Sequence, residues 1–282
     1  MNAPVAIGGL GGSGTRVVAA MVREAGYYLG ADLNRALDNL WYTVLLKRRH
    51  LDAAAEAAAL EVFLAGMRGE LERTERTLQV LTQAATDVSL YGHDASGADR
   101  GAWAFKRIVS LLQAQERPPA RPWGWKEPNT HLRLPALCDR VDDLRYVHVV
   151  RHGLDMAFSA NQRQLAWWGP TLGIDVPTTP EALPRAALRY WAVTTHKVLE
   201  FARNRPDLRL LLLRFEDVCE YPRATVERLL TFLDGPTDIA TISRLAALPQ
   251  TPPSVGRHRG VNPRVFDDRD LALLEQLGYA VG

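Results

Sequence analysis

Cysteine is scarce in this chain of 282 residues. The two cysteines, Cys138 and Cys219, lie far apart and form no Cys-x-x-Cys pair, so neither a zinc site nor a disulfide framework is predicted. Two thiols in a reducing compartment are the simplest interpretation, which favours the cytoplasm. The histidines and carboxylates show no metal-ligand spacing, so we expect no bound metal.

Long apolar runs and a strong excess of one charge are also absent. No segment approaches the ~20 apolar residues of a transmembrane helix, and residues 1–10 lack the basic and apolar parts of a signal peptide. The net charge of +2 lacks the basic balance of many nucleic-acid binders. We therefore expect a cytoplasmic protein without a transmembrane segment or a nucleic-acid partner. The composition predicts no oligomeric state.

Expected strands and helices alternate along most of the chain. Apolar runs predict strands at 5–7, 27–29, 144–150 and 208–213. Helical patterns predict helices at 15–25, 153–167, 183–204, 221–233 and 268–277. This alternation favours an α/β fold with a mostly parallel central sheet flanked by helices. The length is common for one such domain, so we expect residues 1–282 to form one domain, with a helical insert over about 34–115 after the second strand.

A glycine-rich segment follows the first expected strand and opens the first expected helix. Its candidate ligand-binding residues are Gly11, Gly12, Ser13, Gly14, Thr15 and Arg16. Glycines let backbone N–H groups approach an anion, and a helix N-terminus adds partial positive charge. The hydroxyls and the guanidinium add further donors. The segment therefore predicts a phosphate or sulfate ligand.

The glycine segment by itself is also compatible with two other enzyme classes. Residues 9–14 satisfy the GxGxxG pattern, and Asp32 follows near the position of a ribose-binding acid, which predicts an NAD(P)-dependent oxidoreductase. A P-loop-type kinase is the weaker alternative. Thr15 and Arg16 stand where the Walker pattern has Lys and then Ser or Thr, so a main phosphate contact is missing.

A second anion-binding pattern follows the strand expected at 144–150. Arg151 comes directly after this strand, and Ser159 lies about two turns along the expected helix at 153–167. These two side chains can hold one phosphate from two sides, because a planar guanidinium meets phosphate oxygens bidentately. Ligands gather at the carboxyl ends of parallel strands, so we expect this site and the glycine segment at one edge of the sheet.

The pattern Arg-x-x-x-Asp-x-x-x-Ser at 151–159 resembles the 3′-phosphate motif of sulfotransferases that use 3′-phosphoadenosine-5′-phosphosulfate (PAPS). The core Ser13-Gly14-Thr15 is similar to their 5′-phosphosulfate loop. LRFEDV at 213–218 resembles a later strand and helix of that family, and SVGRHR at 254–259 resembles its C-terminal loop. The resemblance spans most of the chain except the expected insert. It implies a P-loop-like sheet and a sulfotransferase with PAPS as co-substrate.

The resemblance also implies roles for the candidate residues. The glycine segment would hold the 5′-phosphosulfate, and Arg151 and Ser159 would hold the 3′-phosphate. Arg257 and Arg259 would close over the nucleotide. Asp155 is expected in the first turn of the helix, where a carboxylate is favourable.

The segment Lys126-Glu127-Pro128 resembles the Lys-Asp-Pro segment of protein-tyrosine and related sulfotransferases, which also lack a lysine in the glycine loop. Sulfuryl transfer depends mainly on positioning and on offsetting charge on the leaving nucleotide. Lys126 and Arg16 are the candidates for that second task.

A general base would remove the acceptor's proton. Asp32 is the first choice and Asp38 the second, while His93, His131 and His152 are weaker candidates. The sulfuryl group would pass to a hydroxyl or amine of a small-molecule, glycan, lipid or peptide acceptor, whose identity the sequence does not disclose.

Overall fold

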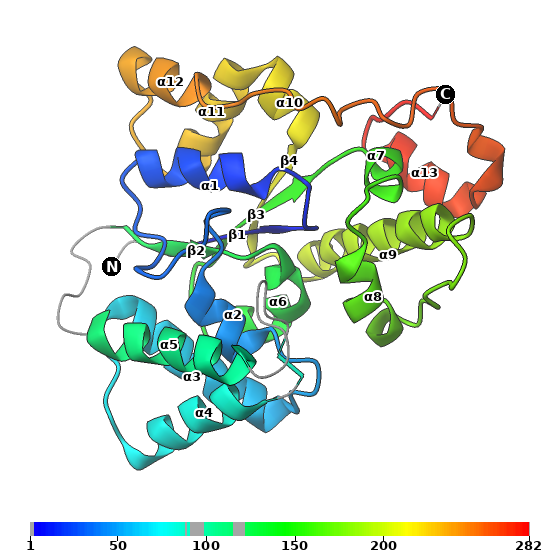
Figure 1. Cartoon of the computed structure of the whole chain (residues 1–282). Helices are drawn as coiled ribbons and strands as arrows, with labels where there is room; N and C mark the ends of the chain where they lie inside the picture. Colours follow the sequence, from blue (N-terminus) through cyan, green and yellow to red (C-terminus); the bar gives the residue numbers. More distant parts are fainter. Residues whose placement is uncertain (1–2, 88, 91–98, 115–121, 282) are drawn as a thin grey trace. The chain divides into compact units, whose positions relative to one another are not determined.

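The computed structural model describes residues 3–87, 89–90, 99–114 and 122–281 (Figure 1). Its strands are β1 (Val5–Gly9), β2 (Gly124–Lys126), β3 (Arg145–Val150) and β4 (Arg209–Arg214). Its α-helices are α1 (Thr15–Glu24), α2 (Leu40–Leu46), α3 (Ala53–Arg68), α4 (Glu75–Thr86), α5 (Asp99–Ala114), α6 (Leu134–Cys138), α7 (Gly153–Ala157), α8 (Arg163–Trp168), α9 (Leu183–Asn204), α10 (Phe215–Glu220), α11 (Pro222–Phe232), α12 (Ile239–Ala246) and α13 (Asp268–Gln276). Short 3₁₀ helices are η1 (Pro128–Arg133), η2 (Pro170–Leu172) and η3 (Pro263–Val265).

The four strands form one parallel sheet in the order β2-β1-β3-β4. β1 and β2 pair from Val5 opposite Gly124 to Ile7 opposite Lys126. Every residue of β1 and β3 is buried, as expected for strands covered on both faces. The predicted parallel sheet flanked by helices is confirmed. The apolar patterns did not predict β2, because this strand is only three residues long.

The second expected strand, at 27–29, is reduced to a single pair. Tyr28 forms one parallel bridge with Trp123. The chain then turns at Gly30, whose φ of +113° ends the extended run. The helices of the expected insert follow this bridge.

The helix expected at 153–167 is interrupted, which corrects the placement of Ser159. α7 and α8 cover its two ends, and Ser159 lies in the turn between them. The reason is Gln162, whose Nε2 donates to the carbonyl oxygens of Met156, Ala157 and Ser159 at 2.9, 3.1 and 2.9 Å. An amide side chain thus satisfies carbonyls that the next helical turn would otherwise use.

Contacts between Cα atoms divide the chain into two compact units. Unit 1 comprises Met1–Gly8 and Ala19–Tyr146, and unit 2 comprises Gly9–Val18 and Val147–Gly282. A single domain over 1–282 stays a prediction.

Within unit 1, α2 packs against α3, α4 and α5, which occupy the expected helical insert (Figure 1). Residues 88, 91–98 and 115 of that insert lie outside the described residues. An aromatic cluster forms the core of the unit: the Phe63 ring lies 5.2 Å from Tyr42 and 5.4 Å from Trp125, edge-to-face with both.

Within unit 2, α7 and α13 pack on the long helix α9. Nowhere in the described part of the chain does a helix combine the length and apolar character that a membrane span requires.

Candidate functional site

The glycine segment lies where β1 is followed by α1. It falls within residues 9–18, which belong to unit 2. Gly12 and Gly14 have φ of +93° and +94°, a conformation that strains residues with a Cβ. At Gly14 a Cβ would also lie 2.0 Å from a ring carbon of Phe215. The backbone therefore packs directly on α10 and has this shape only with glycine.

Ser13 and Thr15 are buried in this segment, with exposed fractions of 2% and 3%. The Ser13 Oγ has no hydrogen-bond partner within the described residues. Since buried polar atoms are almost always hydrogen-bonded, a ligand oxygen is a suitable partner. α1 begins at Thr15 without an acidic residue in its first turn, so no carboxylate offsets the positive N-terminal dipole. This arrangement suits a phosphate or sulfate group.

Arg151 follows β3 and is buried, with 5% exposure. Its Nη1 donates to the Gly12 carbonyl at 3.4 Å, and its Nη2 donates to the Ser254 Oγ at 3.0 Å. Its Nε is buried without a partner within the described residues. Burial lowers the pKa of this guanidinium, which still stays charged at neutral pH. The guanidinium thus connects the glycine segment to the C-terminal loop (residues 251–261), and its Nε is available to a ligand.

Asp155, in the first turn of α7, holds the C-terminal loop. Its carboxylate accepts the Gly256 N–H at 2.7 Å and the His258 N–H at 3.2 Å, and it pairs with His258 Nδ1 at 2.7 Å. Burial opposes ionisation, but the hydrogen bonds from His258 and Gly256 outweigh it and lower the pKa of Asp155. The expected position in the helix N-terminal turn is observed, and the carboxylate also binds a distant loop.

The other candidate nucleotide contacts differ in burial. Arg257 is half-buried and donates to the carbonyls of Ser254 at 3.1 Å and Phe158 at 3.4 Å, so it links the C-terminal loop to the turn that carries Ser159. Arg259 is exposed, and its guanidinium lies over Gly256. Arg16 is exposed in the first turn of α1. The structure therefore gathers the glycine segment, Arg151 and Arg257 in unit 2.

Gln164, on α8, is a site residue that no sequence pattern indicated. Its Oε1 accepts the Gly11 N–H at 2.8 Å. A glutamine in a short helix carries no recognisable signal, and only the fold brings it to the glycine segment. This hydrogen bond places the Gln164 side chain against the glycine segment.

Lys126 and Asp38 form a buried ion pair in unit 1, and both side chains are 3% exposed. Lys126 Nζ also donates to the Ala36 carbonyl at 3.3 Å, and Asn34 Nδ2 donates to Asp38 Oδ2 at 2.8 Å. Burial raises the pKa of Asp38, but the Lys126 ammonium and its hydrogen bond reverse this and lower it below the ordinary value. Asp38 is therefore an ionised carboxylate held against the candidate lysine.

Asp32 has different partners in the same unit. Its Oδ2 accepts the Ser110 hydroxyl at 2.6 Å and lies 3.6 Å from Arg107 Nε. The Ser110 Oγ in turn accepts the Trp41 indole N–H at 2.8 Å. Asp32 thus connects its loop to α5 and α2, whereas Asp38 is the acid that meets Lys126.

Glu127 forms a second buried pair next to Lys126. Lys47 Nζ lies 3.0 Å from Glu127 Oε1, with exposed side-chain fractions of 1% and 0%. The Thr43 hydroxyl donates to Glu127 Oε2 at 3.1 Å. Glu127 also accepts the Asn129 N–H at 3.3 Å at the start of η1. This network connects the residue after Lys126 to α2 and η1.

The weaker base candidates are histidines. His93 lies outside the described residues. Burial lowers the pKa of His131 to about 4, and burial together with His258 lowers the pKa of His152 to about 4. Across the residues that the structure describes, no three His, Cys, Asp or Glu side chains converge as metal ligands would.

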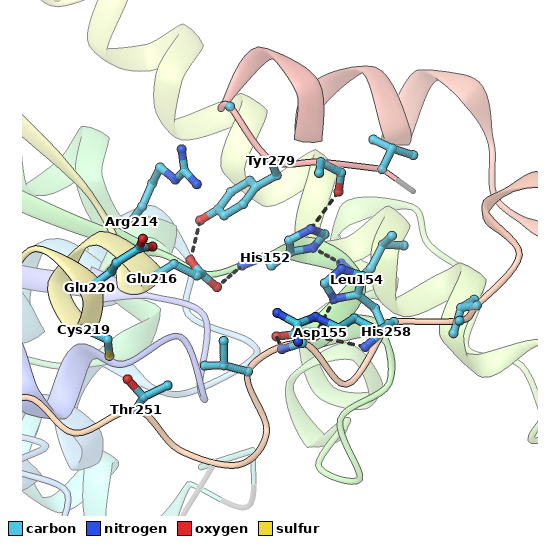
Figure 2. Close-up of a pocket in the computed structure, with 18 residues that line it drawn as sticks. His152, Leu154, Asp155, Arg214, Glu216, Cys219, Glu220, Thr251, His258 and Tyr279 are labelled. Atoms are coloured by element: carbon cyan, nitrogen blue, oxygen red, sulfur yellow. Dashed lines mark hydrogen bonds and ion pairs between the residues drawn. The ribbon is translucent and has the colours of Figure 1, made fainter.

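A cavity of about 730 Å³ lies in unit 2 beside the start of α7 (Figure 2). His152 lines it from the position before α7, Asp155 from α7, Glu216 and Cys219 from α10, and Tyr279 from the segment after α13. The cavity therefore shares Asp155 with the contacts that hold the C-terminal loop.

Known proteins resemble this chain in sequence and in fold. The chain matches the model of the sulfotransferase family over residues 4–238. The structure is similar to the sulfotransferase STF9 of Mycobacterium avium, with 15% identity over 99% of this chain and 78% of that chain and a TM-score of 0.53. It is also similar to the sulfotransferase domain of the Synechococcus PCC 7002 olefin synthase (18% identity, 99% of this chain, 97% of that chain, TM-score 0.52). A third similar structure is the sulfotransferase domain from the curacin biosynthetic pathway (14% identity, 100% of this chain, 99% of that chain, TM-score 0.56). No curated protein matches the sequence. At these identities, the structural similarities show a shared fold.

Proposed function

Because the chain belongs to the sulfotransferase family, we propose that it transfers a sulfuryl group from PAPS to a hydroxyl or amine of an acceptor molecule. The acceptor group belongs to a small molecule, a glycan, a lipid or a peptide. PAPS is a co-substrate in this proposal, and the reaction uses no metal.

The main support for PAPS as the donor is the set of hydrogen bonds made by Arg151. Its guanidinium contacts both the glycine segment and the C-terminal loop, yet its buried Nε lacks a partner within the described residues. PAPS carries one anionic group on its 3′ carbon and another on its 5′ carbon. Arg151 Nε suits the first, and the unpartnered Ser13 Oγ suits the second.

The proposed roles are those that the family resemblance implies, and the two unpartnered donors of Ser13 and Arg151 support them. The 5′-phosphosulfate is held by the glycine segment, namely Gly11, Gly12, Ser13, Gly14, Thr15 and Arg16. The 3′-phosphate is held by Arg151 and Ser159, and Arg257 and Arg259 close over the nucleotide. An oxidoreductase would leave Arg151 and the C-terminal loop without a role.

The proposed reaction breaks the bond between sulfur and the oxygen that bridges to the 5′-phosphate, and that oxygen keeps the electron pair. The acceptor oxygen or nitrogen forms the new bond to sulfur and loses its proton to a base. Positioning and charge stabilisation dominate such a transfer. We assign Lys126 and Arg16 to offset the negative charge on the leaving oxygen.

Asp32 and Asp38 are the two proposed bases. Asp38 is the candidate that contacts Lys126, and it is ionised, as a base must be, but the same pairing lowers its pKa and so its strength as a base. Asp32 already accepts the Ser110 hydroxyl, which supports a structural role for it.

Calorimetry with adenosine 3′,5′-bisphosphate, NADPH and Mg-ATP tests the donor assignment. We expect the bisphosphate to bind to the wild type, and we expect Arg151→Ala to remove most of this affinity. Arg228→Ala is the matched control, since Arg228 is exposed on α11. Binding of NADPH in place of the bisphosphate would overturn the proposal in favour of an oxidoreductase, and binding of Mg-ATP alone would favour a kinase.

A further inference from the structure

The peptide bond between Arg151 and His152 is held at both of its polar atoms. The Arg151 carbonyl accepts the Trp191 indole N–H at 3.0 Å, and the His152 N–H donates to Glu216 Oε1 at 3.0 Å. A peptide unit is planar, so two anchors on opposite sides fix its orientation. The direction in which the Arg151 side chain leaves the backbone therefore depends on Glu216 and Trp191.

Glu216 is itself fixed by the segment that follows α13. The Tyr279 hydroxyl donates to Glu216 Oε2 at 3.1 Å (Figure 2). Tyr279 is only 4% exposed, and the Arg214 guanidinium lies over its ring at 4.4 Å from the centroid. Each carboxylate oxygen of Glu216 thus accepts one hydrogen bond, from His152 and from Tyr279.

The His152 ring gives the same segment a second connection. Its Nδ1 accepts the Leu154 N–H at 3.3 Å, so the proton of the neutral ring is on Nε2, which donates to the Ala280 carbonyl at 2.9 Å. The His152 ring also stacks on His258, with centroids 3.9 Å apart. The residue after Arg151 is therefore held by residues 279–280 through both its backbone and its side chain.

We infer that Tyr279 is a positioning residue for the 3′-phosphate site: through Glu216, its hydroxyl fixes the peptide that aims Arg151. This inference rests on the proposed function, because it takes the 3′-phosphate to be the ligand of Arg151. Tyr279 acts through other residues and does not touch the nucleotide. Removing its hydroxyl leaves one oxygen of Glu216 without its donor and releases the carboxylate to move with the His152 N–H.

The test compares two nucleotides that differ only in the 3′-phosphate. Calorimetry measures binding of adenosine 3′,5′-bisphosphate and of adenosine 5′-monophosphate, which differs from it only by lacking the 3′-phosphate. Tyr279→Phe keeps the ring under Arg214 and removes only the oxygen. We expect this variant to bind the bisphosphate about 5- to 10-fold more weakly, the effect of one hydrogen bond, and to bind the monophosphate as the wild type does.

A matched control exists in the same unit. The Tyr221 hydroxyl also donates to a glutamate, Glu220 at 2.8 Å, but Tyr221 is 57% exposed. Tyr221→Phe should leave the affinity for both nucleotides unchanged.

The possible results separate a failure of the proposed 3′-phosphate site from a failure of the role assigned to Tyr279. If the wild type binds both nucleotides equally, the 3′-phosphate site and this inference both fail. If the wild type prefers the bisphosphate and Tyr279→Phe keeps that preference, only the inference fails. If Tyr279→Phe weakens both nucleotides equally and lowers the Tm, Tyr279 has a purely structural role and the inference is overturned.

Discussion

The carboxylate of Asp155 binds His258 twice, at 3.2 Å from the backbone N–H and at 2.7 Å from the ring Nδ1. The same carboxylate accepts the Gly256 N–H and lies 3.6 Å from Nη2 of Arg151. One buried acid on α7 therefore holds the C-terminal loop beside the guanidinium that we assign to the 3′-phosphate.

Replacing Asp155 by asparagine should loosen this loop. One side of the amide is a donor, so it cannot accept all the N–H groups that the carboxylate receives. We expect the affinity for adenosine 3′,5′-bisphosphate to fall about 10-fold or more, since a hydrogen bond to a charged group is worth roughly 1.5–3 kcal/mol. Calorimetry measures this change, with the exposed Asp207→Asn as control. Unchanged affinity in Asp155→Asn would show that the loop is held without Asp155.

Gly14→Ala should abolish nucleotide binding and lower stability. The new Cβ would lie 2.0 Å from a ring carbon of Phe215, at a φ of +94°. Gly173→Ala separates backbone strain from the clash with Phe215. Gly173 has a φ of +70°, but a Cβ added there would have no neighbouring atom within 4 Å. We expect Gly173→Ala to cost about 1 kcal/mol through backbone strain alone, and Gly14→Ala to cost clearly more in urea unfolding. Equal costs for the two variants would contradict the contact with Phe215.

Replacing Lys126 alone should lower the free energy of unfolding more than replacing Lys126 and Asp38 together. Lys126→Met leaves a buried carboxylate without its counter-ion, which costs about 3–5 kcal/mol. The double variant Lys126→Met/Asp38→Asn should regain most of that free energy of unfolding. It should not regain turnover of PAPS to adenosine 3′,5′-bisphosphate, because the proposed charge on the leaving oxygen is still unopposed.

An exposed ion pair supplies the control for this experiment. Arg185 and Asp267 are 61% and 47% exposed, so Arg185→Met should leave stability essentially unchanged. Recovery of turnover in the Lys126→Met/Asp38→Asn variant would argue that the buried pair is structural only.

Stability should fall as the pH drops from about 6.5 to about 4. The pKa of His152 is about 4 in the folded chain, below the ordinary value of 6.5, because of burial and the neighbouring His258. In that window the unfolded chain binds more protons than the folded chain, so the folded state loses stability as the pH falls. Above pH 6.5 the contribution of this group is complete.

His152→Asn should make this pH dependence shallower. Asparagine can still accept the N–H that caps α7, but it does not titrate. His131, whose pKa is also about 4, supplies the slope that remains. Urea unfolding near neutral pH and near pH 5 measures the difference, and an unchanged slope would mean that His152 is not the titrating group.

Gln164→Glu should weaken nucleotide binding at the glycine segment. The substitution keeps an acceptor for the Gly11 N–H, whose partner Oε1 lies at 2.8 Å, but it places a negative charge beside the anion site. We expect adenosine 5′-phosphosulfate to bind at least several-fold more weakly, and less so at high salt because ions screen the repulsion. Gln164→Leu, which adds no charge, should show a smaller loss. If Gln164→Leu is as harmful as Gln164→Glu, charge is not the cause.

Local sequence patterns predicted the helices and strands whose apolar periodicity is regular over their whole length. The helix expected at 183–204 is α9 within the same bounds, and the strand expected at 144–150 is β3 from Arg145. Ser159 was misplaced because a side-chain amide, that of Gln162, ends α7 in a way that helical periodicity does not encode.

The candidate site likewise contains residues that the sequence indicated and residues that it did not. The glycine segment and Arg151 follow strands and have recognisable neighbours in the sequence, so they could be predicted. Gln164, Glu216 and Tyr279 have hydrogen-bond partners more than 60 residues away, and no local pattern around them marks these contacts. The pairing of Asp38 rather than Asp32 with Lys126 likewise depends on how the loop before α2 is folded.

Unit 2 is discontinuous, since residues 9–18 and 147–282 belong to it while the intervening residues belong to unit 1. During synthesis the glycine segment therefore leaves the ribosome long before Arg151, Asp155 and Ser254 have been made. A nascent or truncated chain that stops before residue 254 lacks most of the C-terminal loop that Arg151 and Asp155 contact. A fragment that starts at residue 147 lacks the glycine segment. Nucleotide binding should thus require both segments of unit 2, and translation products that lack residues 147–282 should not bind the proposed donor.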